Sequence, residues 1–483
     1  MHLARIEAEA STQSRPNPRV SRSAAKTLRS ASGLALAALT LASIAGCGNT
    51  YRPVVSAINP VGPAEQPQKF AVVISTTGTP ANPTPGLVTF VDFSGDTILI
   101  TAQIGVDPYY LVLNSGGTIG YTLNSDHTLT TFGISTALLQ SQVLQTTLLP
   151  GANPVSIFPE GANTYVSDPG LSAVSQFTGQ PLNLQQELAI PAGFTPLYVV
   201  GNTSTLRSYV ITPSTSGGAG QVSTIETASN TIDPTPIPVG HGPVYGVMTP
   251  DNRRAFIMNQ TDGTVSVINV QTNQLDIVPT GATNPIVVGA SPLWADFAPA
   301  RNEMVVANAG DGVNPGSVSI ISIPLCSANA LPTNPNCDPN NPVDAAGFGT
   351  VLATVPVGVN PRMIYVLQDV VNSRAYVVNG GNPNLPCSGP GVIGPSTGCS
   401  VSVINLTTNT VTATIPLPLS LTGSGNSNGH PDYIAVTNGT PTGKVYVTSP
   451  DSNFMTIIRT DIDAVDTTVP LQGNGVSVRV TTP

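Results

Sequence analysis

The chain has 483 residues, of which 40% are hydrophobic and only 9% are charged, and it contains 46 Gly and 46 Pro. This composition excludes a mainly helical architecture, because long helices are built from Ala, Leu, Glu and Lys and are interrupted by Gly and Pro. The Gly has no three-residue period and the apolar fraction is ordinary, which excludes collagen and low-complexity disorder. Short strands joined by tight turns are therefore expected.

The first 46 residues are typical of a signal segment for export. Six basic residues precede an apolar run over 34–44, which is too short to span a bilayer as a helix. The sequence Ile-Ala-Gly-Cys at 44–47 resembles the lipobox of bacterial lipoproteins. This resemblance implies a signal peptide over 1–46, lipidation of Cys47, a tether over 47–68 and a membrane-anchored location in the bacterial cell envelope, facing the periplasm or the cell exterior. The alternative is an ordinary signal peptide with an accidental Cys.

Removal of the signal segment leaves a strongly acidic chain. Eleven basic and 24 acidic residues follow residue 46, for a net charge of about −13. The basic residues form no run longer than Arg253-Arg254. Nucleic acid is therefore excluded as a partner, because its phosphate backbone requires clustered Lys and Arg.

Four further cysteines follow Cys47, and an exported chain permits their oxidation. They stand at the ends of two short loops rich in Pro, Gly and Asn, Cys326 with Cys337 and Cys387 with Cys399. Four cysteines allow three connectivities, and this arrangement favours local pairing within each loop. A zinc site is the alternative, but zinc-binding cysteines usually lie two to four residues apart.

A repeat covers the chain after residue 68. A Gly-x-x-Pro-like turn, here called the anchor turn, is followed each time by an apolar run. The anchor turns end at Pro108, Pro154, Pro196, Pro243, Pro292, Pro361 and Pro431. The first four intervals are 42 to 49 residues long, and the two intervals of 69 and 70 residues contain the two Cys loops as insertions.

Each repeat reads as four short strands. The unit after Pro243 predicts strands over 244–248, 254–259, 264–270 and 274–280, separated by Pro-Asp and Asp-Gly turns. The same order recurs at 375–379, 400–406 and 411–417, and again at 444–449, 454–460 and 464–470. Four-stranded antiparallel units repeated about every 45 residues predict an all-β fold, a β-propeller, as a single domain over 69–483.

Several of these strands carry one recurring motif. Tyr-Val-Val-Asn at 376–379 is followed by SVINLTTNTVTATIPL at 402–417, and variants of the motif stand at 165–168, 256–259 and 446–449. At these residues the chain resembles the YVTN β-propeller repeat family, over nearly all of the chain that follows the signal segment. The resemblance implies an exported or cell-surface propeller, often one without known activity. Lactonase-like propellers are more distantly similar, and none of their catalytic residues can be placed on this sequence.

The count of units predicts eight blades. Seven units begin at the anchor turns, and three strands at 69–75, 86–93 and 97–104 precede them. Their fourth strand is either 476–480 at the C-terminus or 54–58, and the C-terminal choice closes the ring and removes two exposed edges. Seven blades remain the alternative if one weak unit between 105 and 239 is misread.

Motifs for chemistry are absent from the sequence. It contains no His-Glu-x-x-His, Gly-x-Ser-x-Gly, Walker loop or Cys-x-x-Cys. No catalytic, cofactor-binding or metal-binding residue is therefore assigned, and no cofactor is expected. The anchor turns should crowd the mouth of a central channel, and the candidates for a polar binding site there are the residues in or beside these turns: Asp107, His241, Trp294, Arg362, His430 and Asp432. The alternative is that these side chains only build solvated turns.

Loop placement suggests where a partner binds. The Cys387/Cys399 insertion joins second and third strands and should lie on the same face as the anchor turns, whereas the Cys326/Cys337 insertion should lie on the opposite face. Long loops on one face of a rigid scaffold commonly build binding surfaces. The prediction is a lipid-anchored, monomeric binding or scaffolding module for a protein, peptide or glycan, which favours a non-enzyme. The alternative is an extracytoplasmic lactonase-like hydrolase with its site at the channel mouth.

Overall fold

The chain divides into two units, Met1–Glu65 and Gln66–Pro483, and the computed structural model describes residues of the second. The described residues are 69–79, 81–202, 205–276, 283–324, 347–367, 373–385, 387, 399–417, 430–439 and 442–481. The predictions for the signal peptide, Cys47, the tether, 54–58 and the Cys326/Cys337 pair lie outside these residues. Within them, no helix is long and apolar enough to cross a membrane.

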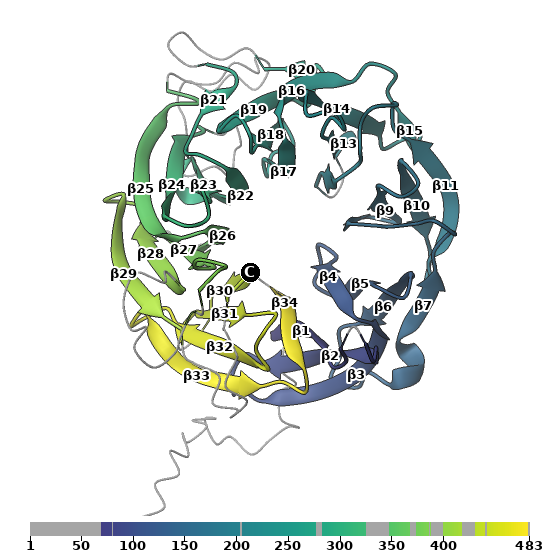
Figure 1. Cartoon of the computed structure of the whole chain (residues 1–483), viewed down its shortest axis with the longest axis vertical. Coiled ribbons are helices and arrows are strands. Elements are labelled where there is room, and N and C mark those ends of the chain that lie inside the picture. Colours follow the sequence, from purple (N-terminus) through teal and green to yellow (C-terminus); the bar gives the residue numbers. More distant parts are fainter. Residues whose placement is uncertain are drawn as a thin grey trace, which may run out of the picture. The chain divides into compact units, whose positions relative to one another are not determined.

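Eight antiparallel sheets are arranged around a common axis, each as one blade (Figure 1). From the innermost strand outward, the first four blades consist of β34 (Asn474–Val480), β1 (Phe70–Thr76), β2 (Pro85–Asp92) and β3 (Ile98–Val106); β4 (Pro108–Leu113), β5 (Ile119–Asn124), β6 (Thr128–Gly133) and β7 (Leu144–Thr147); β8 (Ser156–Glu160), β9 (Asn163–Asp168), β10 (Ala173–Thr178) and β11 (Asn183–Ala189); and β12 (Tyr198–Val200), β13 (Arg207–Thr212), β14 (Ala219–Glu226) with the two short strands β15 (Thr231–Ile232) and β16 (Ile237–His241).

The other four blades follow in chain order. They consist of β17 (Pro243–Met248), β18 (Arg254–Asn259), β19 (Thr264–Asn269) with β20 (Gln274–Leu275) and β21 (Ile286–Val287); β22 (Pro292–Ala298), β23 (Glu303–Asn308), β24 (Pro315–Ser322) and β25 (Val351–Val359); β26 (Pro361–Leu367), β27 (Arg374–Asn379), β28 (Ser400–Asn405) and β29 (Thr410–Pro416); and β30 (Tyr433–Thr437), β31 (Lys444–Thr448), β32 (Phe454–Arg459) and β33 (Ala464–Pro470). Two short 3-10 helices, Gln140–Gln142 and Pro299–Arg301, lie in connections.

The prediction of eight four-stranded blades is confirmed. Of the strand predicted over 274–280, the structure shows only Gln274–Leu275, and the outer edge of that blade is completed by β21, which pairs with the other end of β19. Residues 277–282 lie outside the described part of the chain.

The C-terminal strand closes the ring, as predicted. β34 pairs antiparallel with β1, with Val73 opposite Val478, and becomes the innermost strand of the first blade. A buried lysine reinforces the closure between the last blade and the first, because Lys444 Nζ donates to the Phe93 carbonyl and to Asp96. Both chain ends of the propeller therefore lose their free edges.

Blades pack on each other through the second and third strands, whose side chains are almost all buried. The repeated tyrosine of the second strand is fully buried as Tyr165, Tyr209, Tyr376 and Tyr446. Burial of one such side chain contributes about 1.5–3 kcal/mol. Tyr376 Oη also donates to Asp463 of the next blade at 2.7 Å, which ties the two blades together.

A buried asparagine at the end of the second strand explains two features of the repeat. Asn379 Nδ2 donates to the hydroxyls of Ser400 and Ser402 on the third strand. The anchor-turn glycine Gly358 packs against this amide so closely that an added Cβ would lie 2.7 Å from Asn379 Cγ. The same pairing recurs at Gly105 with Asn124, Gly240 with Asn259, and Gly289 with Asn308. Glycine is required here because no side chain fits above the amide.

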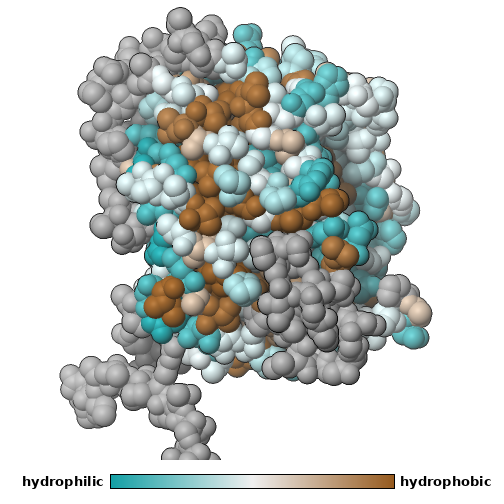
Figure 2. All heavy atoms as spheres, turned by 60° about the vertical axis from the view of Figure 1, so that its left-hand side comes forward, coloured by the Kyte–Doolittle hydropathy of each residue, from teal (hydrophilic) through white to brown (hydrophobic). Residues whose placement is uncertain are grey.

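The outer surface is mixed in character. Figure 2 shows hydrophobic groups interspersed with hydrophilic ones over one side of the propeller. Some of the apolar side chains at the surface are large, such as Val287, which is 68% exposed, and Leu352, which is 47% exposed. Scattered exposure of this kind is normal for folded proteins.

Candidate functional site

The anchor turns and the hairpins between second and third strands lie on one face of the propeller, called here the anchor face. An aspartate in such a hairpin accepts a hydrogen bond from the backbone N–H of an anchor turn in three blades. Asp126 accepts from Val106, Asp262 from His241 and Asp451 from His430. This contact fixes the anchor turn to its own blade. The side chains that follow the turn then lie close to the propeller axis.

The anchor face contains an open pocket of about 540 Å³ between the last two blades. Its lining comes from the turn before β26, the end of β27, the turn before β30 and the hairpin after β31: Asn360, Arg362, Gly380, Gly381, Pro383, His430, Pro431, Asp432, Pro450 and Asp451. Three of the six candidate residues from the sequence, Arg362, His430 and Asp432, therefore line one pocket.

An ion pair between two blades forms one wall of the pocket. Arg362 Nε donates to Asp432 Oδ1 at 2.7 Å, and the two side chains are 43% and 31% exposed. An ion pair this exposed adds little stability, because water screens it. Both side chains keep donors and acceptors for a ligand.

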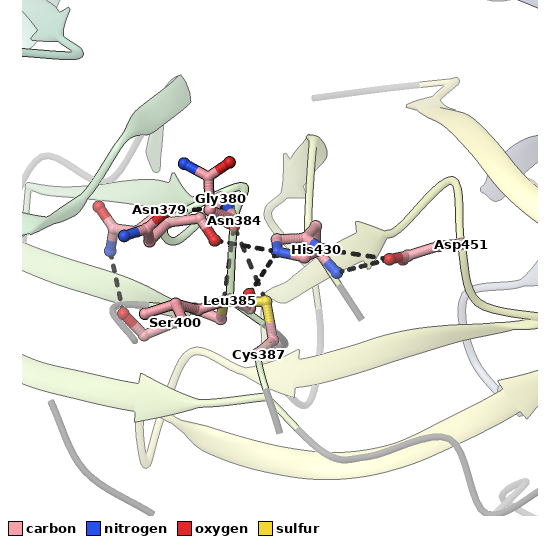
Figure 3. The surroundings of a disulfide bond; sticks show 10 residues. Asn379, Gly380, Asn384, Leu385, Cys387, Ser400, His430 and Asp451 are labelled. Carbon is pink, nitrogen blue, oxygen red and sulfur yellow. Dashed lines mark hydrogen bonds and ion pairs between the residues drawn. A yellow bond between two sulfur atoms is a disulfide. The ribbon is translucent and has the colours of Figure 1, made fainter. Parts of the chain in front are cut away.

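His430 connects the pocket to the hairpin and to the disulfide loop (Figure 3). Its Nδ1 lies 3.2 Å from Asp451 Oδ2, and its Nε2 lies 3.0 Å from the Leu385 carbonyl and 3.3 Å from the Asn382 carbonyl. Both ring nitrogens of His430 therefore lie within hydrogen-bond distance of protein oxygen atoms, and which nitrogen donates depends on the tautomer.

The predicted disulfide between Cys387 and Cys399 is confirmed. It joins the two ends of the insertion between β27 and β28, and both sulfur atoms lie near the Gly380 carbonyl. The two sulfur atoms and a ring nitrogen of His430 lie within 4.8 Å of one another. Metals bind thiolates, so in the oxidised protein this group offers only the histidine as a ligand.

The other three candidate residues lie apart from the pocket. His241 forms a separate pair with Asp262, 3.0 Å from its Nδ1, and the backbone N–H of His241 is the main cause that lowers the pKa of Asp262. Asp107 has a positive φ of 45°, and its carbonyl accepts from Ser125. Trp294 stacks on Tyr245 with ring centroids 4.0 Å apart.

Sequence reasoning missed the aspartates that hold the anchor-turn histidines. Each lies 21 residues after its histidine, Asp262 after His241 and Asp451 after His430. This repeated spacing could have predicted the contact. Two residues at a fixed separation within a repeat occupy equivalent positions in each blade, so a pair that meets in one blade is expected to meet in the other.

The lining residues carry polar groups that could contact a ligand. Among the described lining residues there is no Ser, Thr or Cys that could act as a nucleophile. The ring nitrogens of His430 face groups of the protein. The pocket offers an exposed guanidinium, two carboxylates and backbone groups, which are suited to hold a polar ligand.

Comparison with known proteins supports the fold. No family model and no curated protein matches the chain. Among solved structures, apo AztD from Citrobacter koseri matches with a TM-score of 0.54 and 12% identity, over 85% of this chain and 97% of that one. Dihydro-heme d1 dehydrogenase NirN in complex with DHE matches with a TM-score of 0.54 and 12% identity, over 86% of this chain and 77% of that one. At this identity the likeness shows a shared β-propeller fold, and the resemblance to YVTN repeats stays a prediction.

Proposed function

We propose that this protein is a lipid-anchored, extracytoplasmic binding module whose anchor face holds a protein, peptide or glycan without catalysis. The observation that carries the proposal is the pocket between the last two blades, where Arg362, Asp432 and His430 meet beside a disulfide-bonded loop. The disulfide suits an oxidising compartment. The lipobox-like sequence at 44–47 supplies the anchor at Cys47.

A peptide suits the pocket better than a glycan. The described lining contains no Phe, Tyr or Trp ring on which a sugar could stack. It contains both signs of charge, so a peptide that brings a carboxylate to Arg362 and an amine to Asp432 would exchange one exposed ion pair for two. Screened pairs cost little to open.

Arg362→Ala with a matched control tests this proposal. A form that starts at residue 47 and carries Cys47→Ser is immobilised and exposed to envelope proteins of the producing cell after mild crosslinking. Arg362→Ala should lower recovery of the partner at least tenfold, because truncation of an arginine that acts as a binding hot spot costs about 2 kcal/mol or more, and about 1.4 kcal/mol corresponds to a factor of ten. His241→Ala changes an equivalent anchor turn outside the pocket and should leave recovery unchanged. Equal recovery with all three proteins would reject the pocket as the binding site.

The lipid anchor is tested separately. Cys47→Ser in the full chain should move the protein from the membrane fraction to the soluble fraction and abolish incorporation of labelled fatty acid. Retention in the membrane with no change in labelling would reject lipidation at Cys47.

A hydrolase is the second candidate, and the pairing of His430 with Asp451 at 3.2 Å is the observation that favours it. A histidine held by a carboxylate is the arrangement of a general base. Lactone hydrolysis that is lost in both His430→Ala and Asp451→Asn, and kept in His241→Ala, would replace the binding role with this one.

A further inference from the structure

Aromatic side chains form a band around the propeller axis that the proposed function does not use. They come from six of the innermost strands, one residue from each: Tyr110, Tyr198, Tyr245, Trp294, Tyr365 and Tyr433. Three consecutive ring pairs lie at 4.9, 4.0 and 6.3 Å between centroids, from Tyr198 through Tyr245 and Trp294 to Tyr365. The band therefore continues across four neighbouring blades.

The sequence contains a signal for this band. In five of the seven anchor turns, a Tyr or Trp stands two residues after the proline, as in Pro243-Val-Tyr245 and Pro292-Leu-Trp294. Each anchor proline lies at or just before the start of an innermost strand. The residue two positions after the proline therefore lies at the same height along the propeller axis in each blade.

Arg479 on β34 lies among these aromatic groups. It is within electrostatic range of Tyr365, Tyr433, Tyr110 and Tyr198, which belong to four different blades. Its guanidinium lies 5.5 Å from the centre of the Tyr433 ring. Residues so far apart around the ring reach one cation only if all of them point toward the axis, where the innermost strands surround a common centre (Figure 1).

The positive charge of Arg479 has no carboxylate partner among the described residues. Its Nη1 donates to the Val478 carbonyl at 3.0 Å, and a guanidinium carries five N–H donors. Arg479 is partly buried. Water screens such a charge less than a fully exposed one, so it would attract a bound anion more strongly.

A carboxyl group within electrostatic range of two tyrosines of the band does not neutralise this charge. Asp296 accepts hydrogen bonds from the backbone N–H groups of Phe297 and Val366 at 2.8 and 2.7 Å. Burial raises the pKa of Asp296 to about 7, so a large part of it is uncharged at neutral pH. It therefore opposes an anion at the axis only weakly.

The tyrosines supply neutral donors. Burial is the main cause that raises the pKa of Tyr110, Tyr198, Tyr365 and Tyr433 above 10, so their hydroxyls keep their protons. The same four side chains still have accessible surface. These side chains are therefore only partly buried, and a ligand could contact the part that is accessible.

We propose that Arg479 and the surrounding tyrosines form a binding site on the propeller axis for a small organic carboxylate with a flat aromatic body. The guanidinium pairs with a carboxylate through two parallel hydrogen bonds. The tyrosine hydroxyls donate to the remaining lone pairs of the carboxylate, and the aromatic band holds the flat part of the ligand by stacking. This site is distinct from the anchor-face pocket, and either can exist without the other.

The chain carries its own reporter for this site, since Trp294 is its single tryptophan and belongs to the band. The full protein is titrated with benzoate, acetate and inorganic phosphate at constant ionic strength while Trp294 fluorescence is recorded. Benzoate should give a saturable change with one site per chain, and benzamide, which has the same shape without the charge, should bind at least tenfold more weakly.

Variants separate this site from the pocket. Arg479→Gln should weaken benzoate binding at least tenfold, whereas Arg362→Gln should leave it unchanged. If Arg479→Gln does not fold, Arg479→Lys keeps the charge without the two parallel donors and should show an intermediate affinity. No saturable change with benzoate, equal binding of benzamide, a stronger response to phosphate than to benzoate, or loss of binding in Arg362→Gln would each overturn the assignment.

Discussion

Glu160 provides a quantitative test of the blade interior, because a carboxyl group is buried there with a single polar partner. Its side chain lies at the end of β8, the residue is 7% exposed, and one carboxylate oxygen accepts from Ser208 Oγ at 2.8 Å. Burial raises the pKa of Glu160 from 4.5 to about 6, and the Ser208 bond opposes this rise. The folded protein therefore binds the Glu160 proton more tightly than the unfolded chain does.

This difference determines how stability changes with pH. Below pH 4.5 the group is protonated in both states, and the protonated folded form has its full stability. As the pH rises through 6, the folded protein must bury a charge and loses about 2 kcal/mol, which corresponds to a shift of about 1.5 pKa units. Glu160→Gln removes the titration, so it should raise the free energy of unfolding by about 2 kcal/mol at pH 8 and change it little at pH 4.

Urea unfolding of the wild type and the variant between pH 4 and pH 8 measures this effect. Ser208→Ala is the matched control, because loss of the hydrogen bond should raise the pKa of Glu160 further and destabilise the protein more at pH 8 than at pH 4. A gain from Glu160→Gln that is equal at both pH values, or a loss at pH 8, would show that burial of the charge is not what limits stability here.

Three further substitutions test other parts of the fold. Gly358→Ala would force a Cβ against the buried asparagine of its blade and should lower the free energy of unfolding by about 1–3 kcal/mol; Gly133→Ala, which meets nothing within 4 Å, should have little effect. Lys444→Met removes the cation that pairs with Asp96 and the donor to the Phe93 carbonyl of the first blade, and it should cost about 3–5 kcal/mol in a denaturant melt; a cost below 1 kcal/mol would show that ring closure does not depend on it. Replacing Cys387 and Cys399 together by Ser opens a 12-residue loop and should cost about 3 kcal/mol under non-reducing conditions, with an unchanged midpoint as the contrary result.

Much of the fold could be predicted from local patterns. The alternation of apolar residues over 254–259 and 375–379, with turn residues between the strands, predicted strands that the structure places at β18 and β27. The apolar pattern of a buried strand and the residue types of a turn are set within a few residues. The strands of a single blade can therefore be predicted from the sequence of that blade alone. The C-terminal strand was also predictable, because an incomplete first unit needs one more strand to remove its free edge.

The site was less predictable, because its contacts join different blades. Arg362 and Asp432 are 70 residues apart and meet because the last two blades are neighbours in the ring. His241 occupies the same position in its repeat as His430, yet it has only its own Asp262, since no disulfide loop lies beside it in the described structure. A repeat fixes the position of a residue in its blade, and the neighbouring blade decides what that residue contacts.

The sequence by itself determined the all-β class and the repeated four-stranded units, because these depend on short-range alternation and turn residues. It favoured eight blades, closure by the C-terminal strand and local pairing of Cys387 with Cys399 over their alternatives, and the structure decided each of these in favour of the prediction. Only the tertiary structure decided which anchor-turn residues share a pocket and that tyrosines from separate blades converge on Arg479. Such groups are brought together by closure of the ring, which places residues from distant parts of the chain around one axis. The repeat marks the position of each residue in its own blade, but it does not show which residues of different blades meet.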